Sequence, residues 1–171
     1  MSRTLILLRH GKSDWSTDAD DFDRPLKKRG RNASSKAGKW LHEKMLVPDF
    51  VITSRAKRAV QTAELACKSM GIRIKEIYKQ KHIYLATAEE LLFALEDCPE
   101  QAKRVMLVGH NPGLEELLYY LVGGRVTIPE DGKLMPTAAL AQLEMPDHWG
   151  GLDTGSAELR CLVRPREITE Y

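Results

Sequence analysis

Two arginines and two histidines in this 171-residue chain lie just after short apolar runs, where the chemistry of a binding site would begin. They are Arg9, His10, Arg58 and His110. Arginine presents a planar fork of N–H donors that matches the oxygens of a phosphate. A neutral imidazole can act as a nucleophile, and a protonated one can stabilise negative charge. These residue types together indicate an oxyanion pocket that contains a possible nucleophile.

The runs before these side chains predict buried strands over residues 4–8, 50–53 and 105–108. Strands that alternate with helical periodicity predict an α/β fold, a three-layer α/β/α sandwich with a mainly parallel central sheet. Right-handed crossovers place the carboxyl ends of such strands at one sheet edge, so the four side chains can converge there. The length favours a single domain over residues 1–171.

The remaining elements follow from periodicity and from helix-end signals. Helices are predicted at residues 30–45, 56–70, 87–95 and 112–121, and further strands at residues 72–78, 138–143 and 158–163. Thr87 and Glu90 form a predicted capping box, while Asn111 is the predicted N-cap ahead of Pro112. Residues 13–24 are dense in aspartate and lack periodicity, so we expect a loop that lies over the site as a flap.

The net charge and the cysteines of the chain argue against some classes of binding surface and metal site. The 26 Lys and Arg residues against 24 Asp and Glu give a net charge of +2, which argues against a nucleic-acid or membrane surface. Three cysteines without metal-ligand spacing favour free thiols in a cytoplasmic protein. The charge run Lys27-Lys28-Arg29 with Arg31 is typical of a solvated face, although beside an anion site it could steer an acidic or phosphorylated partner.

Three segments of the chain resemble the signature segments of the histidine phosphatase superfamily, to which phosphoglycerate mutases also belong. They are Arg9-His10-Gly11, residues 54–63, and Val108-Gly109-His110-Asn111-Pro112. Other segments are similar to the SixA branch of phosphohistidine phosphatases: Asp23-Arg24-Pro25-Leu26, Arg29-Gly30 and residues 136–140. Three segments in the right order, each after a strand, make the match specific.

The resemblance implies two-step phosphoryl transfer in a phosphoglycerate mutase-like fold. His10 would attack phosphorus and water would then cleave the phosphohistidine enzyme, while Arg9, Arg58 and His110 hold the phosphoryl oxygens. Arg24 is carried over as a further phosphate ligand, with an ion pair to neighbouring aspartates as its alternative. No cofactor or metal is implied, because the arginines supply the positive charge. His10 must hold the tautomer that leaves its attacking nitrogen free, and a backbone carbonyl could fix it.

One departure bears on the substrate. Many members of the family have a proton-donating Glu or Asp between the second and third segments, but residues 79–86 contain no carboxylate. Imidazole needs less help as a leaving group than an alcohol does, so phosphohistidine in a protein is the favoured substrate. Asp14, Asp18 or Asp21 of the flap could still supply the proton.

Two alternatives stay open. One is a phosphatase for a small phosphomonoester, and the other is an inactive phosphate-binding module. The sequence does not identify the partner protein or the oligomeric state.

Overall fold

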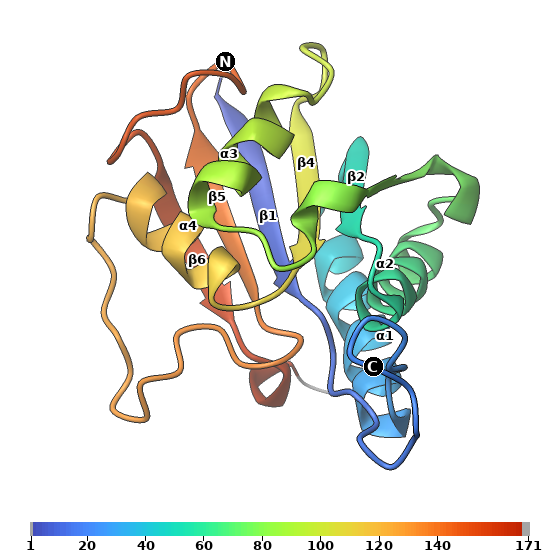
Figure 1. The fold of residues 1–171 in the computed structure, drawn as a ribbon. Coiled ribbons are helices and arrows are strands. Elements are labelled where there is room, and N and C mark those ends of the chain that lie inside the picture. The colour runs from blue at the N-terminus through green and yellow to red at the C-terminus, as the bar shows by residue number, and fades with distance from the viewer. Residues whose placement is uncertain (1, 169–171) are drawn as a thin grey trace.

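The computed structural model describes residues 2–168, which form a six-stranded sheet (Figure 1). The strands are β1 (Arg3–Arg9), β2 (Phe50–Ser54), β3 (Ile77–Gln80), β4 (Arg104–Gly109), β5 (Leu140–Met145) and β6 (Glu158–Val163). Their order across the sheet is β3-β2-β4-β1-β5-β6. The first four strands of that order pair in parallel, and β5 pairs antiparallel with β1 and β6. The predicted mainly parallel sheet is confirmed.

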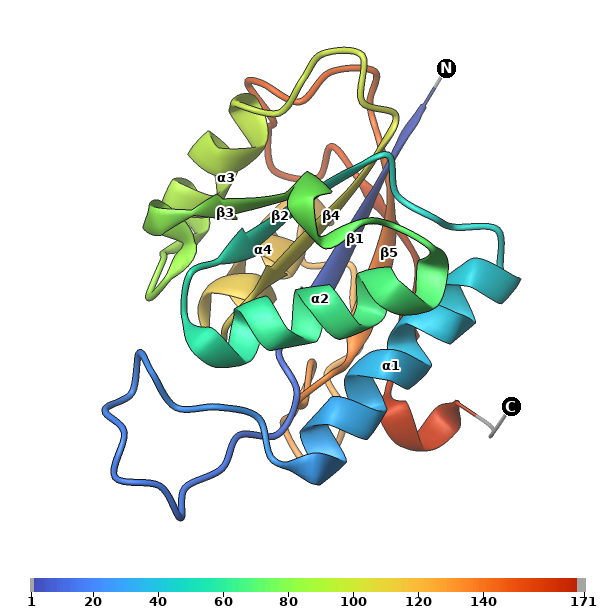
Figure 2. The same ribbon diagram turned by 90° about the vertical axis from the view of Figure 1, so that its right-hand side faces the viewer.

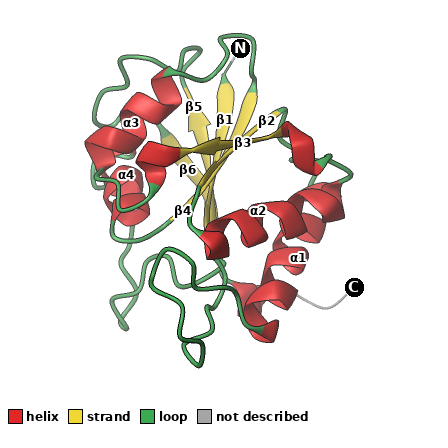
Figure 3. Cartoon of the chain, turned by 45° about the vertical axis from the view of Figure 1, so that its right-hand side comes forward, coloured by secondary structure: helices red, strands yellow, loops and turns green. Residues whose placement is uncertain are grey.

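Helices cover both faces of the sheet, as predicted. They are α1 (Lys28–Glu43), α2 (Lys57–Met70), α3 (Ala88–Glu96) and α4 (Gly113–Leu121). α1 and α2 lie on one face, and α3 and α4 lie on the other (Figures 2 and 3). None of these helices has the length and hydropathy of a membrane-spanning segment within residues 2–168.

The central strand β1 is buried on both faces. Leu5 and Leu7 pack into the apolar cluster under α3 and α4, whereas Ile6 and Leu8 pack into the cluster under α1 and α2. Each such side chain contributes about 1.5–3 kcal/mol by leaving water. This double burial fixes the carboxyl end of β1, where Arg9 lies.

Three predicted element bounds are wrong. The strand at residues 72–78 is instead a short 3-10 turn, Ile74–Glu76, followed by β3, because Ile74 faces solvent and does not pair with β2. The strand predicted from Ala138 begins at Leu140, since Ala138 has a φ of 61° and its N–H bonds to the carbonyls of Arg9 and His10.

The third correction concerns the start of α4. The N-cap is Pro112, and the side chain of Asn111 makes no cap hydrogen bond. Its amide instead donates to Glu115 Oε2 and to the Met135 carbonyl oxygen, both at 2.8 Å. Asn111 therefore ties α4 to the loop before β5.

α1 begins against the loop that follows β1. A Cβ atom added at Gly11 would lie 2.6 Å from the carbonyl oxygen of Gly30, and one added at Gly30 would clash with the backbone of Lys12. Only glycine allows this approach of the two backbones. The contact fixes the segment after His10 to the first turn of α1.

Candidate active site

The four predicted side chains meet at one edge of the sheet. β4 lies beside both β1 and β2, with Arg9 in register with Gly109, so the three strand ends are neighbours. The rings of His10 and His110 are 5.1 Å apart between centroids. Arg58, from the first turn of α2, donates from Nε to His10 Nε2 at 3.4 Å. The expected convergence is therefore present.

His10 has one ring nitrogen occupied and one directed into the site. Nδ1 lies 2.7 Å from the Gly11 carbonyl oxygen. A carbonyl only accepts hydrogen bonds, so Nδ1 carries the proton and Nε2 keeps its lone pair. The expected backbone carbonyl thus fixes the tautomer that a nucleophile needs.

The surroundings of His10 also keep its ring neutral. Burial, followed by the nearby His110, Arg58 and Arg9, lowers the pKa of His10 to about 3, although the bond to Gly11 opposes the shift. A ring with this pKa is unprotonated near neutral pH. Nε2 therefore keeps a lone pair without a separate base, and this lone pair accepts the N–H of Arg58 Nε.

His110 is held by Ser54, the last residue of β2. His110 Nε2 lies 2.7 Å from Ser54 Oγ, which also accepts the N–H of Ala56 at 3.1 Å. We infer that the Ser54 hydroxyl donates to Nε2, which places the ring proton on Nδ1. Burial first, and then Arg58, lowers the pKa of His110 to about 4. Sequence analysis assigned Ser54 no role, although its place at a strand end was a usable signal.

Two buried nitrogens at this edge have no hydrogen-bond partner within residues 2–168. They are His110 Nδ1 and Arg9 Nε. The Arg9 guanidinium is fixed by one bond from Nη1 to the Met135 carbonyl at 3.1 Å, and burial lowers its pKa despite the nearby Glu115. Buried donors are normally satisfied, so unpaired donors beside His10 suit the oxygens of a ligand.

Arg24 reaches the site from the flap, residues 13–24. Its guanidinium lies 3.6 Å from the ring centroid of Trp15, and its Nε donates to Ser13 Oγ at 3.3 Å. The Nη2 group forms an ion pair with Asp21. Arg24 thus makes the ion pair that we kept as its alternative, and its contact with phosphate stays a prediction.

Asp21 places a carboxylate between the candidate phosphate ligands. Its Oδ2 accepts from Arg58 Nη2 at 3.1 Å and from the hydroxyl of Tyr84, while its backbone carbonyl accepts from Arg58 Nη1. The Tyr84 hydroxyl, followed by Arg24 and Arg58, holds the pKa of Asp21 well below its usual range. These contacts favour the carboxylate form of Asp21.

Tyr84 is a site residue that sequence analysis missed. It belongs to the segment 79–86, which contains no carboxylate. Its ring packs edge-on against Phe22 of the flap at 5.1 Å and against His110 at 5.6 Å. Tyr84 therefore links the flap to the candidate active site, through its ring and its hydroxyl.

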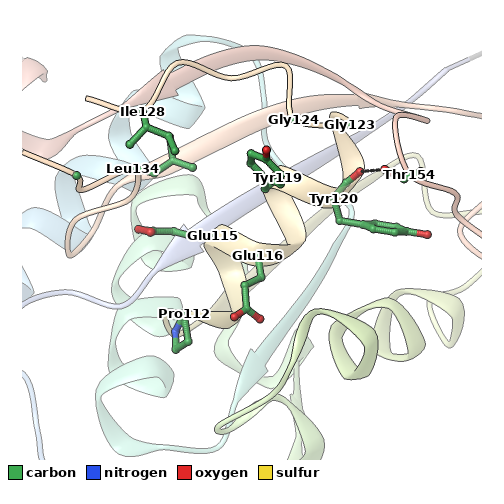
Figure 4. Close-up of a pocket in the computed structure, with 11 residues that line it drawn as sticks. Pro112, Glu115, Glu116, Tyr119, Tyr120, Gly123, Gly124, Ile128, Leu134 and Thr154 are labelled. Carbon is green, nitrogen blue, oxygen red and sulfur yellow. Dashed lines mark hydrogen bonds between the residues drawn. The ribbon is translucent and has the colours of Figure 1, made fainter. Parts of the chain in front are cut away.

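A groove of about 640 Å³ runs along α4 next to this edge (Figure 4). Tyr119 and Tyr120 line it from α4, and Ile128 and Leu134 line it from the loop that follows. The described residues that line the groove include no His, Arg or Lys. The described residues also contain no group of three or more His, Cys, Asp or Glu side chains placed to ligate a metal ion.

A family model, sequence relatives and solved structures all match this chain. The family model for the histidine phosphatase superfamily (branch 1) matches residues 5–91. An uncharacterized protein of Mycobacterium tuberculosis is 29% identical over 163 residues, covering 93% of this chain and 100% of that protein.

Two solved structures, from Nakamurella multipartitia and Agrobacterium tumefaciens, are named as candidates for the phosphohistidine phosphatase SixA. Each is 26% identical to this chain and covers 96% of it. The aligned region covers 97% of the first structure and 99% of the second, with TM-scores of 0.83 and 0.77.

Proposed function

This chain belongs to the histidine phosphatase superfamily, and from that premise we propose that it hydrolyses phosphohistidine in a protein through a phosphoryl intermediate on His10. The observation that supports this proposal best is the state of His10. Its Nδ1 proton is bound to the Gly11 carbonyl, so Nε2 keeps its lone pair and can attack once Arg58 Nε releases it. Phosphohistidine is also the substrate in the names of the two SixA-like structures.

The first step forms a bond between His10 Nε2 and phosphorus. The bond from phosphorus to the leaving nitrogen breaks, and its electron pair stays with the substrate imidazole, which takes up a proton. The Gly11 carbonyl stabilises the positive ring of the phosphohistidine enzyme. In the second step water bonds to phosphorus, the electron pair of the P–N bond returns to Nε2, and the water proton is released.

Arg9, Arg58 and His110 would stabilise charge on the three equatorial oxygens in both steps. Donors fixed in advance stabilise a transition state without reorganising when charge develops. Arg9 Nε and His110 Nδ1 are such donors, because both are buried without a protein partner in the described chain. Arg58 must exchange Asp21 for the phosphoryl oxygens.

The leaving group explains the preference for phosphohistidine over phosphate esters. Residues 79–86 carry no carboxylate, and the nearby Asp21 bonds to Tyr84 and pairs with Arg24 and Arg58, which lowers its pKa. Imidazole accepts a proton easily near neutral pH, whereas an alkoxide does not leave without help.

Replacement of His10 tests this proposal. We expect His10→Ala to lower phosphate release from a phosphohistidine protein by roughly a thousandfold or more, as loss of a nucleophile does elsewhere. The exposed His82 offers the matched control, His82→Ala, with unchanged release. An alkaline quench with labelled substrate should also trap phosphoryl enzyme in the parent protein and in His82→Ala, and not in His10→Ala. Undiminished release by His10→Ala would contradict the proposal.

Substrate comparison separates the two alternatives. A phosphatase for small phosphomonoesters would show a higher kcat/KM on sugar or nucleotide phosphates than on phosphohistidine protein. A phosphate-binding module would bind inorganic phosphate and turn over neither.

A further inference from the structure

A second hollow, separate from the groove along α4, collects positive charge from four distant segments. Its volume is about 280 Å³. The cationic residues that line it are Lys12, Arg29, Lys133, Arg164 and Arg166, and the carboxylate among the lining residues is that of Asp131. We name this feature the basic hollow. Such an excess of cations is unusual in a chain whose charges nearly balance overall.

The outer cations of the basic hollow are free to bind a ligand. The side chains of Lys12, Arg29, Lys133 and Arg166 are exposed. Within residues 2–168 none of the four makes an ion pair or a side-chain hydrogen bond. Lys133 attracts the nearby Asp131 carboxylate without forming an ion pair. Clustered exposed cations also attract anions from solution.

The inner wall of the basic hollow is rigid. Arg164 is buried, donates from Nη1 to Asp131 Oδ2 at 3.3 Å, and donates from Nη2 to the Lys133 carbonyl at 2.6 Å. The turn Pro165–Glu167, which carries Arg166, packs against α1, which carries Arg29. The cations are therefore held around one space rather than scattered over the surface.

The basic hollow adjoins the candidate active site. Lys12 follows His10 by two residues, so their Cα atoms are at most about 7 Å apart. Thr137, on another wall, precedes Ala138, whose N–H bonds to the His10 carbonyl at 2.9 Å. The hollow and His10 are therefore joined by two short backbone segments, residues 10–12 and 137–138.

We propose that the basic hollow is a second anion subsite, which binds acidic side chains next to the phosphorylated histidine of a protein substrate. The proposal rests on the proposed function, whose protein substrate it specifies. Carboxylates fit because exposed Lys and Arg side chains surround the space. Nucleic acid fits less well, since no aromatic side chain lines the hollow to stack a base.

Two phosphohistidine peptides of equal length test the subsite. One carries three glutamates beside the phosphohistidine, and the other carries glutamines at those positions. For each protein we take the kcat/KM of the acidic peptide divided by that of the neutral peptide. We expect this ratio to be roughly tenfold lower in Arg29→Gln/Arg166→Gln than in the parent protein, because two exposed charge contacts are lost. Lys39→Gln/Lys103→Gln removes the same charge from exposed positions outside the hollow and should leave the ratio unchanged. An unchanged ratio in the first variant, or an equal fall in both variants, would overturn the proposal.

A binding measurement keeps this test independent of catalysis. A labelled, unphosphorylated hexaglutamate peptide should bind the full chain at low salt, and the Arg29→Gln/Arg166→Gln variant should bind it roughly tenfold more weakly. Equal binding by both proteins would overturn the subsite even if the enzyme hydrolyses phosphohistidine. Tighter binding of a single-stranded oligonucleotide of equal charge would overturn the choice of ligand. If the parent protein bound hexaglutamate but did not hydrolyse phosphohistidine peptides, the result would count against the proposed function and not against the subsite.

Discussion

At His10, burial and hydrogen bonding act on different forms of the ring. Burial disfavours the charged form and keeps the free side chain neutral, with a pKa of about 3. The Gly11 carbonyl fixes the proton on Nδ1 and would also stabilise the positive ring once Nε2 carries a phosphoryl group. Burial therefore favours the neutral ring that the proposed attack needs, whereas the Gly11 contact would serve both the attack and the intermediate.

We expect Asp21 to compete with phosphate for arginine. Its carboxylate pairs with Arg24 and Arg58, so a phosphoryl group that binds either side chain would have to replace it. We expect Asp21→Asn to lower the KM for aryl phosphate and the inhibition constant for inorganic phosphate by roughly fivefold, because an amide holds the arginines less strongly. Steady-state kinetics with phosphate as inhibitor measures both constants.

Asp18→Asn is the matched control for this change, since Asp18 is an exposed aspartate of the same flap. It should leave both constants unaltered. A large fall in kcat for Asp21→Asn, with KM unchanged, would mean that Asp21 donates the proton and does not merely compete.

At the scale of elements, the contact between α1 and the loop after β1 positions both sites. Gly30→Ala would place a methyl group against the Lys12 backbone, which cannot move without shifting His10 or α1. We expect a loss of roughly 2–4 kcal/mol in the free energy of unfolding, together with lower phosphatase activity.

Denaturant unfolding of Gly30→Ala measures this loss. The control is Asn32→Ala, an exposed position on the same helix, which should be neutral or slightly stabilising because alanine favours helices. Equal stability of Gly30→Ala and the parent protein would show that α1 is free to move away from the loop.

The sequence predicted the elements whose signals are local. The buried runs of β1, β2 and β4 and the capping box at Thr87 and Glu90 lie where expected. β3 was misplaced because alternating apolar residues suggest a strand even where Ile74 finds no partner strand.

The candidate site was predictable in part, because only some of its residues carry a local signal in the sequence. Strand ends identified Arg9, His10 and His110, whose convergence follows from parallel topology. The links from Tyr84 to Asp21 and from Ser54 to His110 join residues 63 and 56 positions apart, and no periodicity encodes such pairs.

At the scale of the whole molecule, the two buried histidines make stability depend on pH. Both are neutral in the folded protein, with pKa values of about 3 for His10 and about 4 for His110. In the unfolded chain a histidine has a pKa of about 6.5. Below that pH the unfolded state binds protons that the folded state does not, so stability falls as pH falls.

Each buried histidine should reduce the free energy of unfolding by up to about 1.4 kcal/mol per pH unit between pH 6.5 and the pKa of its folded state. Urea unfolding at intervals from pH 7 to pH 5 measures the combined slope, in a window above most carboxylate titrations. His110→Gln should roughly halve this slope, whereas His82→Gln, at an exposed position, should leave it unchanged. A flat profile for the parent protein would mean that the two rings accept protons in the folded state. The nucleophile would then be protonated over part of that range, and activity would decline with the same midpoint.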